Sequence, residues 1–342
     1  MHKTTSAPGL KKSAKPARSH WRRASYGLSG ILALTAASAS AQVTFNIAFD
    51  ASANVLTTAE KTNVSSHLQE AGRRWVNQLV IGGSRSIEIT VFVSNIPTAS
   101  GGSVTTGYVG SINGRDTYEQ GVAAELRLGT DPNGATGDAV VTFGLAYLRN
   151  ELWFDPNPQA RTAPVPVDKT DAMSTALHEL GHILAYNGFA DVSTGQPPAT
   201  YWSIWDRWMI PGQPTFFSGP NAVASWGSMP DLTIGNINHW ANPARALDGL
   251  FNESCPNDTT LWLHGAPVPR QCLAPGSIDP PHSLDGQRTG QVDAGSSLIY
   301  QLMNGVVFYR GTRYDLSPLD IGVLRDVGLT VDRIFVSAFE SP

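Results

Sequence analysis

Outside its first 41 residues, this chain of 342 residues has few basic side chains. The whole chain contains 24 basic and 28 acidic residues, but residues 1–41 hold seven of the basic residues and none of the acidic ones. Residues 42–342 therefore carry 17 basic and 28 acidic side chains, a net charge of −11. So acidic a chain lacks the positive surface that binds nucleic acid or anionic membranes, and we expect neither as a partner.

Residues 1–41 have the layout of an export signal. A basic segment precedes a weakly apolar stretch around Gly30–Leu34, and Ala39-Ser40-Ala41 fits a cleavage site before Gln42. The apolar stretch is short and rich in small residues for a transmembrane helix, and an uncleaved membrane anchor is the alternative. Arg22-Arg23 is compatible with twin-arginine as well as Sec export. We expect a secreted or periplasmic protein without a membrane anchor after cleavage.

Cysteine is nearly absent: only Cys255 and Cys272 occur. Their spacing matches no zinc-ligand pattern, and no further cysteine is present to complete a thiolate site. In an exported protein, a closely spaced even pair is typical of a disulfide that closes a surface loop. We expect a Cys255–Cys272 disulfide, with two free buried thiols as the alternative.

The nucleophile elbow G-x-S-x-G of serine hydrolases is also absent, and Gly227-Ser228 lacks its frame. What the chain does contain is the run His178-Glu179-Leu180-Gly181-His182. Residues four apart lie on one face of an α-helix, so both imidazoles can hold one zinc ion. The adjacent glutamate can then take a proton from a water molecule at the metal. The alternative is a helix whose two histidines and glutamate are merely solvated.

The surrounding pattern predicts that helix. Apolar residues recur at helical spacing in Met173, Leu177, Leu180 and Leu184. Asp168, with Asp171 three residues later, resembles a capping box at its start, and Asn187-Gly188 is typical of a helix end.

The order of elements predicts an α+β protein. Alternating or apolar segments predict strands, helical spacing predicts a helix, and a glycine- and serine-rich stretch predicts a loop. In chain order these are strand 43–49, helix 58–80, strand 86–93, loop 98–102 and strands 122–128 and 139–143. His67 is expected to be an ordinary packing or surface histidine. Residues 42–188 would form an N-terminal subdomain with a mixed sheet, and residues 189–342 an irregular, loop-rich C-terminal subdomain. In the latter, Ser317-Pro318-Leu319-Asp320 predicts a capped helix that ends at Gly328.

A catalytic zinc ion needs a third protein ligand. The metzincin pattern H-E-x-x-H-x-x-G-x-x-H is not met, because Ala185 and Gly188 stand at its last two fixed positions. Only three histidines follow the helix, namely His239, His264 and His282. His264 lies between the two cysteines and is expected on a loop excursion, whereas His282 is the serious competitor of His239.

Four downstream elements bear on this choice: Phe217–Ala224, Asn238-His239-Trp240, Gln301–Gly305 and Leu316–Leu329. In that order, and together with the helix, they resemble the leishmanolysin-like branch of the metzincins and its bacterial relatives. The resemblance spans Asp171 to Leu329. It implies a zincin fold of the metzincin type, with His178, His182 and His239 as zinc ligands, Glu179 as general base and Met303 beneath the metal. No cysteine precedes the catalytic helix, which excludes the family's latency through a propeptide cysteine.

These features predict an exported zinc endopeptidase that acts on proteins or peptides. The alternative is a secreted binding or adhesion protein that keeps a zincin scaffold without turnover, since fold does not determine function. The presence of Glu179 favours the enzyme. The sequence specifies neither the cleavage preference nor the oligomeric state.

Overall fold

The computed structural model describes residues 42–134, 136–212, 215–233, 235–241, 298–305 and 308–332. It also gives the backbone of an antiparallel hairpin of β14 (Thr260–Leu263) and β15 (Ala266–Pro269). The predictions for residues 1–41, for the two cysteines, and for His264 and His282 lie outside the described residues.

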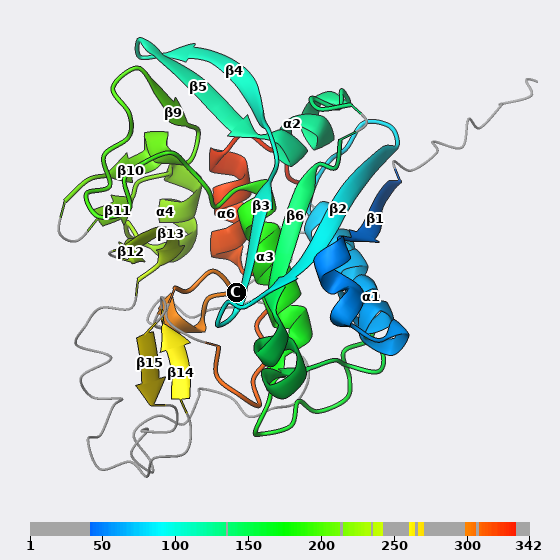
Figure 1. The fold of residues 1–342 in the computed structure, drawn as a ribbon. Helices are drawn as coiled ribbons and strands as arrows, with labels where there is room; N and C mark the ends of the chain where they lie inside the picture. The colour runs from blue at the N-terminus through cyan, green and yellow to red at the C-terminus, as the bar shows by residue number, and fades with distance from the viewer. Residues whose placement is uncertain are drawn as a thin grey trace, which may run out of the picture. The chain divides into compact units, whose positions relative to one another are not determined.

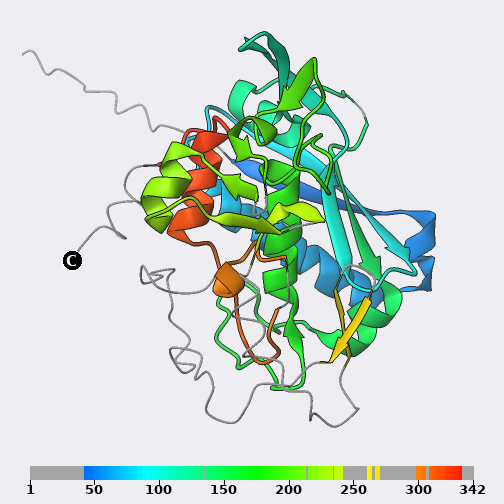
Figure 2. The ribbon, with the colours of Figure 1, turned by 90° about the vertical axis from the view of Figure 1, so that its left-hand side faces the viewer.

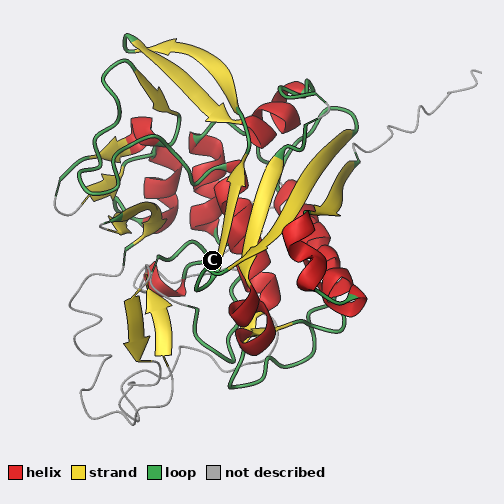
Figure 3. Ribbon diagram, in the orientation of Figure 1, coloured by secondary structure: helices red, strands yellow, loops and turns green. Residues whose placement is uncertain are grey.

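A four-stranded mixed sheet dominates the N-terminal half (Figures 1 and 3). Its order is β1 (Val43–Phe49), β2 (Arg85–Ser94), β6 (Ala139–Gly144) and β3 (Ala99–Ser103). The first three strands are parallel, and β3 runs antiparallel to β6. The predictions of β1, β2 and β6 are confirmed, because their alternating side chains cover a buried face.

The edge strand β3 corrects the prediction of a loop at 98–102. Its glycines, which argue against a strand in isolation, are required by close packing. A Cβ atom on Gly101 would overlap the backbone carbonyl of Glu179 in the neighbouring helix. The strand is thus formed by its ladder to β6 and by its approach to that helix, and neither is visible in the local sequence.

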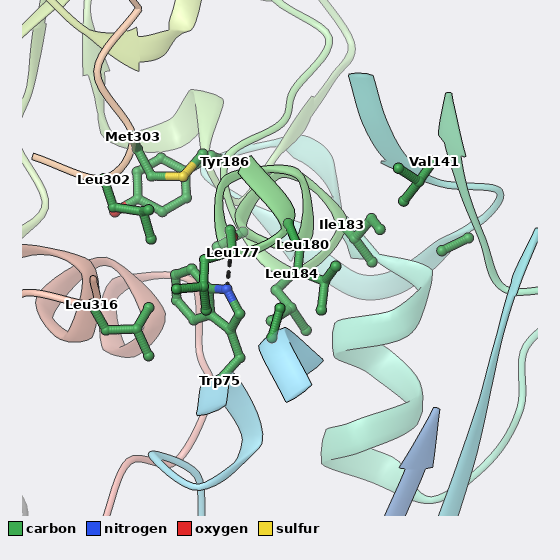
Figure 4. Close-up of a cluster of buried hydrophobic side chains, with 14 of the residues drawn as sticks. Trp75, Val141, Leu177, Leu180, Ile183, Leu184, Tyr186, Leu302, Met303 and Leu316 are labelled. Carbon is green, nitrogen blue, oxygen red and sulfur yellow. Dashed lines mark hydrogen bonds between the residues drawn. The ribbon is translucent and has the colours of Figure 1, made fainter. Parts of the chain in front are cut away.

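Two long helices pack beside this sheet, α1 (Thr58–Val76) against β1 and α3 (Ala172–Leu184) against β3. They also contact each other, and the indole N–H of Trp75 donates to the carbonyl of Leu177 at 2.9 Å (Figure 4). The helix predicted at 58–80 ends earlier, at Val76. Val80 instead donates its N–H to Thr330, because the chain there pairs with the C-terminal segment. His67 is buried and packed, as expected.

The segment 122–128, predicted as a strand, is the helix α2 (Gly121–Leu128). Its Ala, Leu, Glu and Arg residues are strong helix formers. Because most of the helix is buried, its sequence lacks the alternation of apolar and polar faces that usually indicates a helix. The helix ends at Gly129, whose φ of +74° is the left-handed conformation that glycine adopts without strain.

Shorter elements complete the described chain. A three-stranded sheet contains β4 (Thr106–Ile112), β5 (Arg115–Gln120) and β9 (Tyr201–Ser203). An antiparallel sheet contains β10 (Met209–Ile210), β11 (Thr215–Phe217), β12 (Asp231–Thr233) and β13 (Asn236–Trp240). A parallel pair joins β7 (Leu152–Trp153) to β8 (Thr170–Asp171). Single helical turns lie at Ala51–Val55, Tyr147–Glu151, Asp206–Trp208 and Leu298–Tyr300. The described chain is a mixed α+β protein.

Two C-terminal helices, α4 (Pro220–Trp226) and α6 (Pro318–Asp326), pack on each other (Figure 2). The predicted capping box of α6 is confirmed, with Ser317 and Asp320 bonded reciprocally. At the other end of α6, the carboxylate of Asp326 accepts the backbone N–H groups of Asn221 and Ala222 at 3.0 and 2.8 Å. The carboxylate thus satisfies two of the free donors at the start of α4.

The described helices include none with the length and apolar character needed to cross a lipid bilayer.

Candidate metal centre

The helix α3 begins at Asp171 as N-cap, three residues after the position predicted for the cap, Asp168. The Asp171 carboxylate accepts from the N–H and hydroxyl of Ser174 and pairs with Arg161 at 2.7 Å. The helix ends at Leu184 rather than at Asn187-Gly188, because Tyr186 leaves the helical path to bury its side chain. Almost the whole helix is buried, including Glu179 and His182.

Three imidazoles converge beside α3. His178 and His182 project from successive turns of the helix, and His239 comes from β13. The three Nε2 atoms form a nearly equilateral triangle, with separations of 3.0 Å from His239 to each helix histidine and 3.1 Å between the latter two. The structure thus brings together all three histidines that the resemblance implied.

The protonation of two of these rings follows from their other nitrogen. Nδ1 of His178 donates to the carbonyl of Leu302 at 2.8 Å, and Nδ1 of His182 donates to the carbonyl of Tyr186 at 2.7 Å. A carbonyl can only accept, so in both neutral rings the proton is on Nδ1 and Nε2 carries a lone pair. Burial lowers the pKa of His178, also under the influence of His182, to about 3 and that of His182 to about 4, which keeps both rings neutral near pH 7.

Two lone pairs therefore face each other across 3.1 Å. Without a cation this arrangement is repulsive, whereas a shared cation makes it attractive. Three nitrogens 3.0–3.1 Å apart can all lie at about 2.0–2.1 Å from one zinc ion, the distance at which zinc binds imidazole nitrogen. Carbonyl acceptors on the outer nitrogens are also the usual partners of zinc-binding imidazoles. The residues present therefore fit a zinc ion.

One short segment, Gln301–Gly305, contacts both α3 and β13 at the histidine centre. Besides the Leu302 carbonyl, it contributes the side chain of Met303, which is fully buried against α3 (Figure 4). A Cβ atom on Gly181 would lie 2.5 Å from the Met303 sulfur, so the glycine makes room for the methionine. The segment also pairs with β13, the strand of His239. The backbone N–H of Trp240 donates to the carbonyl of Met303, and the backbone N–H of Gly305 donates to the carbonyl of Trp240.

Glu179 follows His178 in α3, and its side chain is only 5% exposed. Burial raises the pKa of its carboxyl to about 8, and a hydrogen bond from the backbone N–H of Gly101 opposes the rise. Gly101 belongs to β3, so the edge strand contacts the glutamate directly. A nearby divalent cation would favour the ionised carboxylate.

A further layer supports His182 through Tyr186. The Tyr186 hydroxyl donates to Asp320 at 2.8 Å, in the capping box of α6, and its ring lies 5.0 Å from that of Trp205. No sequence motif points to Tyr186, to the backbone carbonyl of Leu302 or to Gly101. The sequence signal available for Tyr186 was indirect: a large polar aromatic follows the helix where a cap glycine is usual.

Comparisons of the chain with models of protein families, with curated proteins and with solved structures find no match.

Proposed function

We propose that this protein is a zinc-dependent endopeptidase. The observation that carries the proposal is the triangle of Nε2 atoms, two of which carry facing lone pairs and belong to the helix that also holds the buried Glu179. Neutral histidine nitrogens are ligands that zinc favours, and three protein ligands are typical of catalytic sites.

When bound, zinc lowers the pKa of a water molecule towards neutrality and polarises a scissile carbonyl. Glu179, which follows His178 in α3, would accept the proton of that water and return it to the leaving amine. The Nδ1 bonds of His178 and His182 fix the orientation of both rings.

The strand β3 supports a peptide as substrate. It is the edge of its four-stranded sheet among the described strands, and it contacts Glu179 through Gly101. An edge strand presents backbone N–H and C=O groups that an extended peptide can pair with. Because the strand is rich in glycine, it offers backbone rather than bulky side chains. We infer that the scissile segment lies along β3.

The finer architecture belongs to the same proposal. We infer a zincin fold of the metzincin type, in which α3 carries two ligands, His239 is the third and the Met303 turn lies beneath them. Its support is the contact of Met303 with Gly181 and the order of these elements along the chain. Export through cleavage of residues 1–41 rests on the leader pattern alone.

The test combines metal analysis with a general protein substrate. The purified protein should contain about one zinc per molecule and lose hydrolysis on chelation. Glu179→Gln should keep the zinc and reduce hydrolysis at least about 100-fold, because the proton acceptor is lost. Glu60→Gln makes the same change in a carboxylate of α1 that pairs with Arg149, and should leave hydrolysis unchanged.

Zinc-loaded protein without hydrolysis of any protein substrate would instead support the binding protein. Unchanged turnover in Glu179→Gln would remove this glutamate from the mechanism, and protein purified without zinc would overturn the proposal.

A further inference from the structure

A second group of potential metal ligands lies near the start of β6. Glu125 is in the last turn of α2, Asp131 is in the loop that follows, and Asp138 immediately precedes β6. One carboxylate oxygen of each lies within 4.8 Å of one from each of the other two. None of the three belongs to the histidine centre.

Two of these carboxylates are buried with an oxygen that has no partner. Glu125 is 5% and Asp138 1% exposed, and neither Oε2 of Glu125 nor Oδ1 of Asp138 has a hydrogen-bond partner within the described chain. The other oxygen of Asp138 accepts the N–H of Glu88 at 2.7 Å. Burial of an unpaired carboxylate is costly, so such oxygens call for a cation or a proton.

Arg85 lies nearby but is bonded to backbone carbonyls rather than to these carboxylates. Arg85 donates through Nε to the backbone carbonyl of Glu125 and through Nη1 to that of Ser84. A fourth carboxylate, Glu88, adds further negative charge. Burial and the neighbouring acids raise the pKa of Glu125 to about 7 and that of Asp138 to about 6.

We propose that Glu125, Asp131 and Asp138 bind a calcium ion. Calcium takes oxygen ligands at about 2.3–2.6 Å, so two of its ligands can lie up to about 5 Å apart, which agrees with the 4.8 Å spread of the cluster. Calcium also accepts irregular all-protein coordination, whereas magnesium demands near-octahedral geometry and retains water.

A turn of the chain holds Asp131 in place. Oδ1 of Asp131 accepts the N–H groups of Asn133 and Gly134 at 2.8 and 2.7 Å, which folds the chain into a tight turn. Gly134 has a φ of +63°, which glycine adopts without strain. The turn holds the exposed Asp131 beside the two buried acids, where it can complete the ligand set.

The ion would join elements that support the peptidase site. The carbonyl of Asp138 accepts the N–H of Val104 at 2.8 Å, directly after β3, and its N–H donates to Glu88 in β2. Calcium at this junction would therefore stabilise α2, β2, β3 and β6 together. The inference does not depend on the proposed function, because it concerns carboxylates that are separate from the histidine cluster.

The test uses the purified zinc-loaded protein, dialysed free of calcium. Titration calorimetry with calcium chloride should detect one site, and calcium at about 100 times its Kd should raise the Tm by at least about 5 °C. Magnesium at the same concentration should raise it by less than half as much. Glu125→Gln and the exposed-site variant Asp131→Asn should abolish both responses while keeping the circular dichroism of the folded protein.

Asp191→Asn is the matched control. Asp191 forms the same kind of turn, accepting the N–H groups of Ser193 and Thr194, but belongs to no acidic cluster in the described chain. This variant should bind calcium as the original protein does. Absence of calcium binding would overturn the proposal and leave protons as the occupants, and an equal response to magnesium would overturn the assignment to calcium. Loss of calcium binding in Asp191→Asn would overturn the choice of ligands.

Discussion

Leu302 and Tyr186 contribute to the histidine centre through their backbone carbonyls. Each accepts the Nδ1 proton of one helix histidine, at 2.8 and 2.7 Å, and so leaves Nε2 free to bind a metal. A carbonyl is present whatever the side chain, so this orientation depends on the path of the backbone. Residue changes at these positions should therefore keep the two Nδ1 hydrogen bonds as long as the backbone does not move.

His239 should be indispensable for zinc binding. Its Nε2 lies 3.0 Å from that of each helix histidine, and two remaining ligands cannot hold a catalytic zinc ion firmly. We expect His239→Ala to lose zinc and hydrolysis together, measured by metal analysis and substrate turnover. His264→Ala and His282→Ala are the matched variants and should retain both. Loss of zinc from His282→Ala instead would show that the third ligand is wrongly assigned.

Gly181 should accept a side chain only if the fully buried thioether of Met303 moves. A Cβ atom there would lie 2.5 Å from the sulfur and 2.9 Å from Cε of the fully buried Met303. Overpacking of this kind costs about 1–3 kcal/mol, against a gain of up to about 1 kcal/mol in helix propensity. Gly181→Ala should therefore lower the free energy of unfolding, measured in urea, and weaken zinc binding.

Met303→Ala supplies the control for that prediction. In the double variant the cavity left by methionine receives the new methyl group, so the cost should be smaller than the sum of the two single costs. Strict additivity of the three free energies would contradict a direct contact.

At the scale of elements, α6 contacts the histidine centre indirectly, through Tyr186. Its capping-box residue Asp320 accepts both the Ser317 N–H and the Tyr186 hydroxyl, each at 2.8 Å. Its far end holds α4 through Asp326. The helix α6 therefore contacts both Tyr186, which follows α3, and the start of α4. A shift of α6 would move Tyr186, whose carbonyl orients His182.

The junction of α2 and β6 should make stability depend on pH when calcium is absent. Burial, Asp138, Asp131 and Glu88 raise the pKa of Glu125 to about 7, while Arg85 lowers it. A raised carboxyl pKa means that the folded state binds the proton more tightly, so this contribution is complete below pH 4.5 and is lost as pH rises through about 7.

We expect the calcium-free protein to show a Tm that falls across this interval more steeply than that of Glu125→Gln. Saturating calcium should flatten the profile of the original protein, because the ion stabilises the ionised carboxylates. Identical profiles for the original protein and Glu125→Gln would contradict the assignment of the pH dependence to this residue.

At the scale of the molecule, the histidine centre joins distant parts of the chain. His178 contacts His239, which is 61 residues away in the sequence, and the carbonyl of Leu302, which is 124 residues away. The segment between Ala241 and Leu298, apart from the backbone of β14 and β15, lies outside the described residues. It contains both cysteines, His264 and His282.

A disulfide between Cys255 and Cys272 should restrict this segment. It would close a loop of about 17 residues and contribute roughly 3 kcal/mol. Peptide mapping without reductant should find the two residues linked. Cys255→Ser and the double serine variant should lose the same stability, because either change breaks the same bond. Two thiols that react with an alkylating agent in the native protein would show the prediction to be wrong.

Several features of this protein follow from its sequence alone, because their causes are local. The strands β1, β2 and β6 and the burial of α1 follow from the spacing of apolar residues, and the capping box of α6 from four consecutive residues. The common face of His178 and His182 follows from helix geometry. These patterns record which side of an element is buried and how it begins.

Other features were decided only by the tertiary structure, because their causes lie far away in the chain. The strand β3 exists through its ladder to β6 and the close approach of Gly101 to α3, against its local propensity. The ends of α1 and α3 are set by contacts with Thr330 and by the burial of Tyr186. The carbonyls that orient the histidines have no side-chain signature, so packing alone determines which backbone atoms reach the imidazoles.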